Sequence, residues 1–287
     1  MAIAVYELSE LTDEEFEKIS DLVKSLCGIN LHQGKKELVK ARLSKRLRAL
    51  GFTRFEEYIR YVRNDGGGDE LVAMLDSIST NLTSFFREPV HFDYLAEQVL
   101  PAIAARAGPG RRSLRIWSAG CSTGEEPYTI GIVVSENIPN LDSWDVRILA
   151  TDLSTRVLAR AREGLYEADR LKGVPGLLIG RYFSCVETHR PRLYRVNDRL
   201  RGLVTFARLN LLGSWPMRGP FDVIFCRNVM IYFDKPTQTR LVERFWEVLG
   251  PGGVLFVGHS ESLAGVKHRF EYVQPTVYRK GTGDAER

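Results

Sequence analysis

Apolar residues recur every three or four positions through roughly the first 90 residues, which is the spacing of helices that bury one face. In the first such run, Phe16 to Leu26, the apolar positions fall on one side of a helix. Thr12 and Glu15 precede it at the spacing of a capping box, and Gly28 marks its end. The pattern predicts a helix with defined ends.

Three more helices are expected before the pattern changes. One runs from about Lys35 to Leu50. The next follows a second capping-box spacing at Thr53 and Glu56, and the last follows the glycines at 66–68. Helical runs without strand signals predict a small all-α domain over residues 1–90, joined to a second domain over residues 91–287.

After Pro89 a helix to about Arg106 is expected, and then apolar runs of strand length alternate with helical runs. Strands are expected at Leu114–Ser118, Val146–Thr151, Val204–Leu209, Phe221–Cys226, Val254–Gly258 and Thr276–Arg279, and helices at Glu126–Asn137, Thr155–Glu163 and Pro236–Leu249. Such alternation predicts an α/β fold with a doubly wound, Rossmann-like sheet.

One stretch breaks the alternation. Residues 166–202 are rich in arginine, and two short segments that resemble strands, Tyr182–Val186 and Leu193–Val196, flank a turn. The predicted fold class is therefore an α/β sheet with a small inserted antiparallel β subdomain, preceded by the small all-α domain.

The composition excludes several classes of protein but does not indicate a function. Hydrophobic residues make up 44% and charged residues 26% of the 287 residues, as in ordinary globular proteins. No apolar run approaches the roughly 18 residues of a membrane span, and the acidic first ten residues are no secretory signal. A cytoplasmic protein without membrane insertion is expected. The four cysteines and five histidines are scattered, which predicts reduced thiols and no metal.

The first expected strand of the α/β region runs into a turn suited to a ligand, which reads Ala119-Gly120-Cys121-Ser122-Thr123-Gly124-Glu125-Glu126. Neither the three-glycine dinucleotide fingerprint nor the Gly-Lys-Ser/Thr phosphate loop is present. Two carboxylates follow instead, which repel a phosphate but can pair with an amine or a ribose hydroxyl. S-adenosylmethionine, which has an ammonium group and no phosphate, fits this turn; a plain tight turn would explain the same glycines.

Two further positions favour that ligand. Asp152 stands at the tip of the second expected strand, where a carboxylate can accept hydrogen bonds from both ribose hydroxyls, although it can also cap the next helix. Arg87 ends a string between the two domains, and its guanidinium can bind a carboxylate such as that of the methionine part.

These strings resemble the chemotaxis receptor methyltransferase family (CheR-type). The resemblance rests on Asn81-Leu82-Thr83-x-Phe85-Phe86-Arg87, on Ser122-Thr123-Gly124-Glu125-Glu126-Pro127-Tyr128, and on Phe225-Cys226-Arg227-Asn228-Val229-Met230-Ile231-Tyr232-Phe233. Gly258-His259-Ser260-Glu261 and Thr276-Val277-Tyr278 also fit. Several unusual strings stand in the same order from about Thr12 to Lys280.

The resemblance implies a reaction, a cofactor and a partner. S-adenosylmethionine would esterify glutamate side chains on the cytoplasmic domains of methyl-accepting chemoreceptors and leave as S-adenosylhomocysteine. The positions that match the family's cofactor site are Asn81, Thr83, Arg87, Gly120, Glu125, Asp152, Asn210, Leu211, Arg227 and Asn228. Asn210 and Leu211 follow an expected strand, where an adenine would lie at the sheet edge; ordinary core packing would also explain Leu211. A monomer is expected.

Such a reaction needs no general base, because an acceptor carboxylate with a pKa of about 4.3 is already ionised at neutral pH. The enzyme has mainly to align oxygen, methyl carbon and sulfur and to exclude water. No catalytic acid or base is therefore assigned. Tyr232 and His259 are candidates to orient the acceptor, and structural hydrogen bonding explains them equally well.

The second expected helix is strongly basic. Arg42, Lys45 and Arg48 recur at i, i+3 and i+6, and Arg46 lies beside them. A solvated helix face is the plain explanation. Given the resemblance, we expect these four residues to dock an acidic receptor segment.

The turn expected in the β insertion, Ser184 to Arg192, has no glycine. Members of the family that hold a peptide from the receptor C-terminus tend to have a glycine-rich turn there. We therefore expect this chain to dock without that peptide.

Different functions fit parts of the same sequence. A pI of about 8.8 suits a nucleic-acid methyltransferase. However, the string 222–228 lacks the Asp/Asn-Pro-Pro-aromatic motif of amino-directed enzymes, and no proline precedes Cys226, so no nucleic-acid partner is expected. A methyltransferase for another protein substrate is compatible with the cofactor positions, and the retention of all these positions disfavours a non-catalytic cofactor-binding scaffold without excluding it. The glycine fingerprint of a nicotinamide dehydrogenase is absent.

Overall fold

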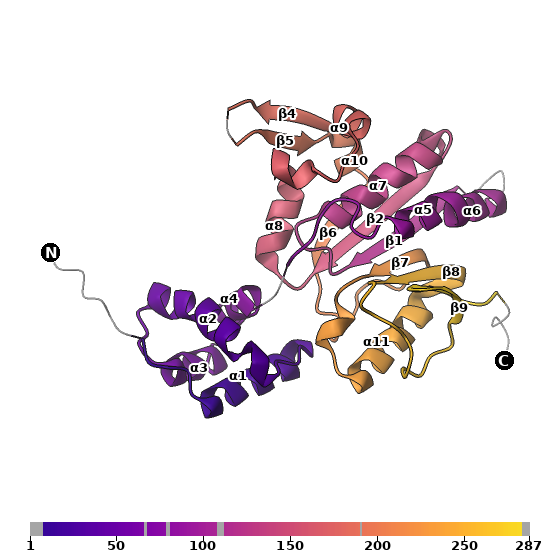
Figure 1. Cartoon of the computed structure of the whole chain (residues 1–287). Helices are drawn as coiled ribbons and strands as arrows, with labels where there is room; N and C mark the ends of the chain where they lie inside the picture. Colours follow the sequence, from indigo (N-terminus) through magenta and orange to yellow (C-terminus); the bar gives the residue numbers. More distant parts are fainter. Residues whose placement is uncertain (1–7, 66–67, 79–80, 108–111, 190, 283–287) are drawn as a thin grey trace.

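The computed structural model of the chain describes residues 8–65, 68–78, 81–107, 112–189 and 191–282 (Figure 1). Its first part is a bundle of short helices, drawn in indigo and purple. The helices are α1 Asp13–Cys27, η1 Gln33–Lys35, α2 Lys36–Leu50, α3 Phe55–Arg63 and α4 Asp69–Ile78. Their apolar faces enclose one core that includes Phe16, Leu43, Tyr58 and Met74. The small all-α domain is confirmed.

Of the two capping boxes expected from the sequence, the structure contains one. Thr12 caps α1 with both reciprocal hydrogen bonds of a capping box, and Gly28 ends it in the left-handed conformation at φ 75°. The second expected box, at Thr53 and Glu56, is wrong, because α3 starts one residue further on without a side-chain cap. The amide of Glu56 donates instead to Oε1 of Glu15 at 3.1 Å. A carboxylate from a neighbouring helix has replaced the local cap.

The second part is a mixed sheet of seven strands in the order β6-β2-β1-β7-β8-β10-β9. The strands are β1 Ser113–Ala119, β2 Asp145–Asp152, β6 Val204–Arg208, β7 Phe221–Cys226, β8 Leu249–Val257, β9 Glu271–Gln274 and β10 Val277–Arg279. The first five in spatial order are parallel, whereas β10 is antiparallel to both of its neighbours. The strand order reverses at β1, and open α/β sheets bind ligands at this switch point.

Helices cover both faces of the sheet (Figure 1), as a doubly wound sheet requires. They are α5 Val90–Tyr94, the π-helical turn η2 Leu95–Val99, α6 Leu100–Arg106, α7 Glu125–Asn137, α8 Thr155–Glu163 and α11 Lys235–Val248, with short 3-10 turns η3 Leu141–Ser143 and η5 Met230–Tyr232. Alternate residues of β1 point to different cores: Ile116 packs with α7, and Trp117 packs with α11. The predicted fold class is confirmed.

The inserted subdomain is also present over the expected residues, and it contains more elements than expected. It contains β3 Leu165–Glu167, η4 Ala168–Leu171, α9 Gly176–Tyr182, β4 Phe183–Glu187, β5 Leu193–Val196 and α10 Asp198–Arg201. The strands form an antiparallel sheet in the order β3-β5-β4. Neither β3 nor α9 was expected, and β9 was also missed. All three are short elements of three to seven residues, so their local sequence signal is weak.

Among the described residues, no helix combines the length and the apolarity that a membrane crossing requires.

Candidate functional site

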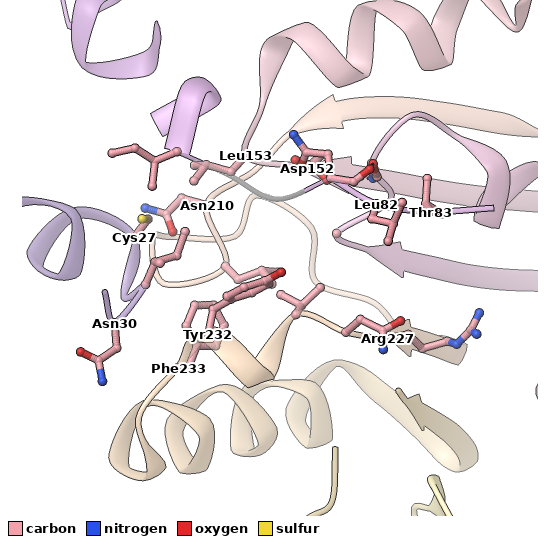
Figure 2. Close-up of a pocket in the computed structure, with 18 of the residues that line it drawn as sticks. Cys27, Asn30, Leu82, Thr83, Asp152, Leu153, Asn210, Arg227, Tyr232 and Phe233 are labelled. Atoms are coloured by element: carbon pink, nitrogen blue, oxygen red, sulfur yellow. Dashed lines mark hydrogen bonds between the residues drawn. The ribbon is translucent and has the colours of Figure 1, made fainter. Parts of the chain in front are cut away.

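A cavity opens where the helical domain meets the carboxyl ends of β1, β2, β6 and β7 (Figure 2). It holds about 1280 Å³ of space, part of which is open to solvent. Of the ten residues expected to contact the cofactor, nine line it: Asn81, Thr83, Arg87, Gly120, Asp152, Asn210, Leu211, Arg227 and Asn228. The tertiary structure thus gathers residues that lie up to 147 positions apart, since 228 minus 81 is 147.

The turn after β1 forms one edge of the cavity. Gly120 has φ +88°, and a Cβ atom there would lie 2.4 Å from Cγ2 of Val229. Both the conformation and the close approach require glycine. The backbone amides of Gly120 and Cys121 donate to the carbonyl of Thr151 at 2.8 and 2.9 Å, which ties the turn to the end of β2. The backbone can therefore lie directly against a ligand.

Asp152 lies at the tip of β2, as expected. Its Oδ2 accepts from the amide of Ser122 at 2.8 Å, and Oδ1 accepts from the amide of Ser154 at 2.9 Å. Burial raises the pKa of Asp152, although these two amide bonds oppose the shift. The N-cap of α8 is Ser154, whose hydroxyl accepts from the Val157 amide. Asp152 lines the cavity and is not the helix cap.

Arg227, after β7, lies between two carboxylates. Its side chain is 2% exposed; it pairs with Glu88 at 3.0 Å and with Glu126 at 3.1 Å. It also donates to the carbonyl of Arg87. Burial acts to raise the pKa of Glu88, but Arg227, together with the amide of His259 and the side chain of Asn228, holds that pKa below its usual value. Arg227 therefore organises the acidic wall of the cavity.

The two adjacent glutamates after the turn have different surroundings. Glu126 lines the cavity; its Oε1 accepts from Ser118 Oγ at 2.6 Å and its Oε2 pairs with Arg227. Glu125 is fully buried, and its carboxylate faces Arg170 and the hydroxyl of Thr123. The expectation for Glu125 therefore differs from the geometry, because the first turn of α7 directs consecutive side chains about 100° apart. Glu126 faces the cavity in its place.

Arg87 also lines the cavity and retains donors for a ligand. Nη1 donates to the carbonyl of Leu82 at 2.9 Å, and within the described part of the chain no carboxylate forms an ion pair with this guanidinium. The cavity therefore contains an arginine without an acidic partner as well as the carboxylates of Glu126 and Asp152. This arrangement is complementary to a ligand that carries both a negative and a positive charge.

Asn210 connects the two domains, and Leu211 is held within the second one. The side-chain amide of Asn210 donates to the carbonyl of Leu26 at 2.6 Å. The carbonyl of Leu211 accepts from Trp215 Nε1 at 3.1 Å and from Arg244 Nη1 at 2.7 Å. Because these groups are engaged, the contact that Leu211 offers a ligand is its amide or its apolar side chain.

Tyr232 lines the cavity and His259 does not. The Tyr232 carbonyl accepts from the amide of Asn30 at 2.8 Å, and Lys35 Nζ lies 6.0 Å from the centre of its ring. The exposed His259 donates its backbone amide to Glu88 at 3.2 Å. These positions keep Tyr232 as a candidate to orient the acceptor and explain His259 as part of the Glu88 network.

Sequence reasoning missed the contribution of the helical domain to this cavity. Residues at the end of α1 and the start of α2 line it, namely Cys27, Ile29, Asn30, Leu31, Lys35, Leu38 and Val39. Nothing in their local pattern marks them, because their role depends on how the two domains pack.

The basic face of α2 divides into two kinds of residue. Lys45 and Arg48 are exposed, whereas Arg42 donates to the carbonyl of Ile78. Arg46 pairs with Glu70, which is 7% exposed and also accepts from the Tyr58 hydroxyl at 2.7 Å. Arg42 and Arg46 thus have structural contacts, and Lys45 and Arg48 provide the open charge.

One group of side chains among the described residues has the spacing of metal ligands. Ligand atoms of Glu88, His91 and His259 lie within 4.8 Å of one another. The Glu88 oxygens already accept from Arg227, Asn228 and the amide of His259. This carboxylate is occupied by neighbouring donors.

Both parts of the chain match models of known protein families. The family model described as "CheR methyltransferase, SAM binding domain" matches residues 81–279, and "CheR methyltransferase, all-alpha domain" matches residues 14–79.

Curated relatives match over nearly their whole length. A probable chemotaxis protein methyltransferase of Rhizobium etli is 44% identical and covers 91% of this chain and 99% of the relative. A chemotaxis protein methyltransferase of Borreliella burgdorferi is 41% identical and covers 94% and 95%. One from Escherichia coli is 40% identical and covers 97% and 94%.

Proposed function

Because this chain belongs to the CheR methyltransferase family, we propose that it transfers a methyl group from S-adenosylmethionine to glutamate side chains of bacterial chemoreceptors, for chemotactic adaptation. The product is a glutamyl methyl ester, and the enzyme is an S-adenosylmethionine-dependent methyltransferase. The observation that carries the proposal is the cavity between the two domains, which has the family's motif residues on its walls.

The residues of the cavity fit this cofactor chemically. Arg87 can bind a carboxylate and Glu126 an ammonium group, and Asp152 has acceptor capacity for hydroxyl groups. The turn at Gly120 leaves no room for a side chain, so a ligand can pack against the backbone. When bound, S-adenosylmethionine supplies a methyl group already activated by a sulfonium. We assign Glu126 rather than Glu125 to the ammonium group.

The chain itself has to bring the acceptor oxygen to that methyl group and keep water away. Exposed and half-exposed residues among the first 90 line the cavity, including the half-exposed Lys35 and the exposed Leu38 and Leu82. Lys35 places a positive charge near the path of an ionised glutamate. Tyr232, beside Lys35, is our candidate for orienting that carboxylate.

We assign residues 1–90 to receptor docking and residues 91–287 to methyl transfer. Leu38, Arg42 and Lys45 are spaced at i, i+4 and i+7 along α2, so one helix face leads from the cavity toward the exposed charges. An acidic acceptor helix would suit this face. We propose that the enzyme acts in the cytoplasm, on the cytoplasmic part of a receptor, and that it acts as a monomer.

Transfer of labelled methyl from S-adenosylmethionine to a receptor cytoplasmic fragment tests the function. Label released as methanol by mild base identifies a carboxyl methyl ester. Base-stable label would contradict the proposal and support methylation of nitrogen or carbon on another substrate. Cofactor binding without transfer to any receptor fragment offered would support a scaffold.

A further inference from the structure

A buried carboxylate that takes no part in the proposed chemistry lies behind the cavity wall. Glu261 follows the turn after β8 and is 7% exposed. Its Oε2 accepts from the backbone amides of Gly258 at 2.6 Å and Asn228 at 2.8 Å, and its Oε1 accepts from the amide of Ile231 at 3.1 Å. Two of these three donors belong to the loop after β7.

That loop forms one wall of the cavity. It contributes the lining residues Arg227, Asn228, Val229 and Tyr232. Asn228 has φ +58°, in the left-handed region, which asparagine tolerates better than most residues with a side chain. The turn and the loop approach closely, since a Cβ on Gly258 would lie 2.7 Å from the Asn228 amide nitrogen. Contacts outside the loop therefore hold it in this shape.

Glu261 supports the backbone of the loop through hydrogen bonds rather than an ion pair, whereas Glu88 and Glu126 bind the loop's side chains. Within the described residues Glu261 forms no salt bridge, and its partners are peptide N–H groups. Burial raises its pKa, and the amide bonds counteract the rise. A buried charge without a cation costs folding free energy, so an apolar residue would serve packing better; the carboxylate instead gathers three donors at one point.

We propose that Glu261 is a positioning residue for methyl transfer, which holds the loop Arg227–Tyr232 in the conformation that binds the cofactor. The inference rests on the proposed function, because it assumes that the cavity binds S-adenosylmethionine. Glu261 itself is not among the residues that line the cavity, so it acts only through the loop.

A graded series of variants follows from the geometry. In Glu261→Gln the amide oxygen can replace Oε2 and keep the Gly258 and Asn228 donors, while its NH2 group faces the Ile231 amide and loses one bond. Glu261→Ala loses all three. Because apparent affinity falls with the fraction of protein in the binding-competent state, we expect the Kd for S-adenosylmethionine to rise about threefold in Gln and tenfold or more in Ala.

The test is titration calorimetry with S-adenosylmethionine well below the unfolding temperature, with circular dichroism to establish folding. Glu247→Gln, at an exposed position on α11, is the matched control and should leave Kd unchanged. In steady-state assays the KM for the cofactor should rise while kcat at saturation stays close to that of the wild type, because bound cofactor selects the competent loop.

The outcomes distinguish a failure of the positioning role of Glu261 from a failure of the proposed function. A folded Glu261→Ala protein with wild-type Kd, or with a lower unfolding temperature as its sole defect, overturns the positioning role. Wild-type protein that binds no S-adenosylmethionine overturns the proposed function instead. A fall in kcat with unchanged KM would also overturn the inference, since it would place Glu261 in the transfer step.

Discussion

Asn210 reaches across the domain boundary to Leu26: its side-chain amide donates a 2.6 Å hydrogen bond to the backbone carbonyl one residue before the end of α1. Two other contacts cross nearby, from the Asn30 amide to the Tyr232 carbonyl at 2.8 Å and between Lys24 and Asp234 at 3.1 Å. The helical domain therefore forms part of the cavity wall, in addition to the docking role that we propose for it.

Asn210→Asp tests this link. The substitution replaces the donor with a carboxylate that faces a carbonyl oxygen, and the loss of such a bond costs about 1–3 kcal/mol. We expect the Kd for S-adenosylmethionine to rise roughly tenfold, as measured by calorimetry. Asn137→Asp, which alters a side-chain bond to the Val133 carbonyl within α7, is the control. Equal effects of the two variants on affinity would contradict the link.

Glu125 and Glu126 should differ sharply. Glu126→Gln removes the negative charge that faces the proposed ammonium group, and we expect about a tenfold loss of cofactor affinity or more. Glu125→Gln weakens the contact with Arg170 away from the cavity and should mainly lower the unfolding temperature. Calorimetry and thermal denaturation of both variants measure this. If Glu125→Gln lost more cofactor affinity than Glu126→Gln, the ammonium group would have to be assigned to Glu125 instead.

Gly120→Ala should impair both folding and binding. The left-handed φ costs roughly 1–2 kcal/mol, and the new Cβ would lie 2.4 Å from Val229 Cγ2. Gly51→Ala, with φ +77° and no atom within 4 Å of its Cβ, carries the conformational cost alone. We expect Gly120→Ala to lower the free energy of unfolding more than Gly51→Ala does. Adding Val229→Ala to Gly120→Ala should remove this extra loss, because it removes the steric contact. No recovery would mean that the steric contact is unimportant.

Charge reversal on α2 should affect the acceptor and spare the cofactor. For Lys45→Glu with Arg48→Glu we expect a KM for the receptor fragment about tenfold higher, with the Kd for S-adenosylmethionine unchanged. The wild-type KM should rise with salt as these exposed charges are screened. Arg46→Gln is a contrasting variant, because it leaves the buried Glu70 without its ion pair and should lower stability by about 1–3 kcal/mol. A receptor KM insensitive to the double reversal would exclude this docking face.

Acid should weaken the contact between the domains by protonating Asp234. Hydrogen bonds from Thr237, and then from Lys24, lower the pKa of Asp234 to about 2. A lowered pKa stabilises the folded state above the ordinary value of about 4, and that contribution is lost as the pH falls toward the folded value. Asp234→Ala should cost about 1 kcal/mol at neutral pH through loss of the α11 cap. The difference in unfolding free energy from wild type should shrink between pH 4 and about pH 2; a constant difference would rule out this contribution.

Much of the fold could be read locally. Helices such as α1 and α8 have strong periodicity and clear end signals, and β7 is an apolar run of strand length, so their predicted bounds were correct or nearly so. The short β3, β9 and α9 were missed, because a few residues carry little local preference and their pairing partners decide their structure.

For the candidate site, the amino-acid sequence by itself determined which side chains are available and the turn chemistry that puts them at strand ends: a glycine after β1, an aspartate after β2, and Arg227 with Asn228 after β7. Parallel strands bring their carboxyl ends to one edge, so these residues had to lie near one another.

Only the tertiary structure decided that Glu126 faces the cavity while Glu125 pairs with Arg170, and that Arg46 is bound to Glu70 while Lys45 is exposed. It also decided that the Glu261 carboxylate accepts hydrogen bonds from the loop after β7. The physical reason is that each choice depends on partners far away in the chain, whose positions follow from how the domains and layers pack and are invisible to local spacing.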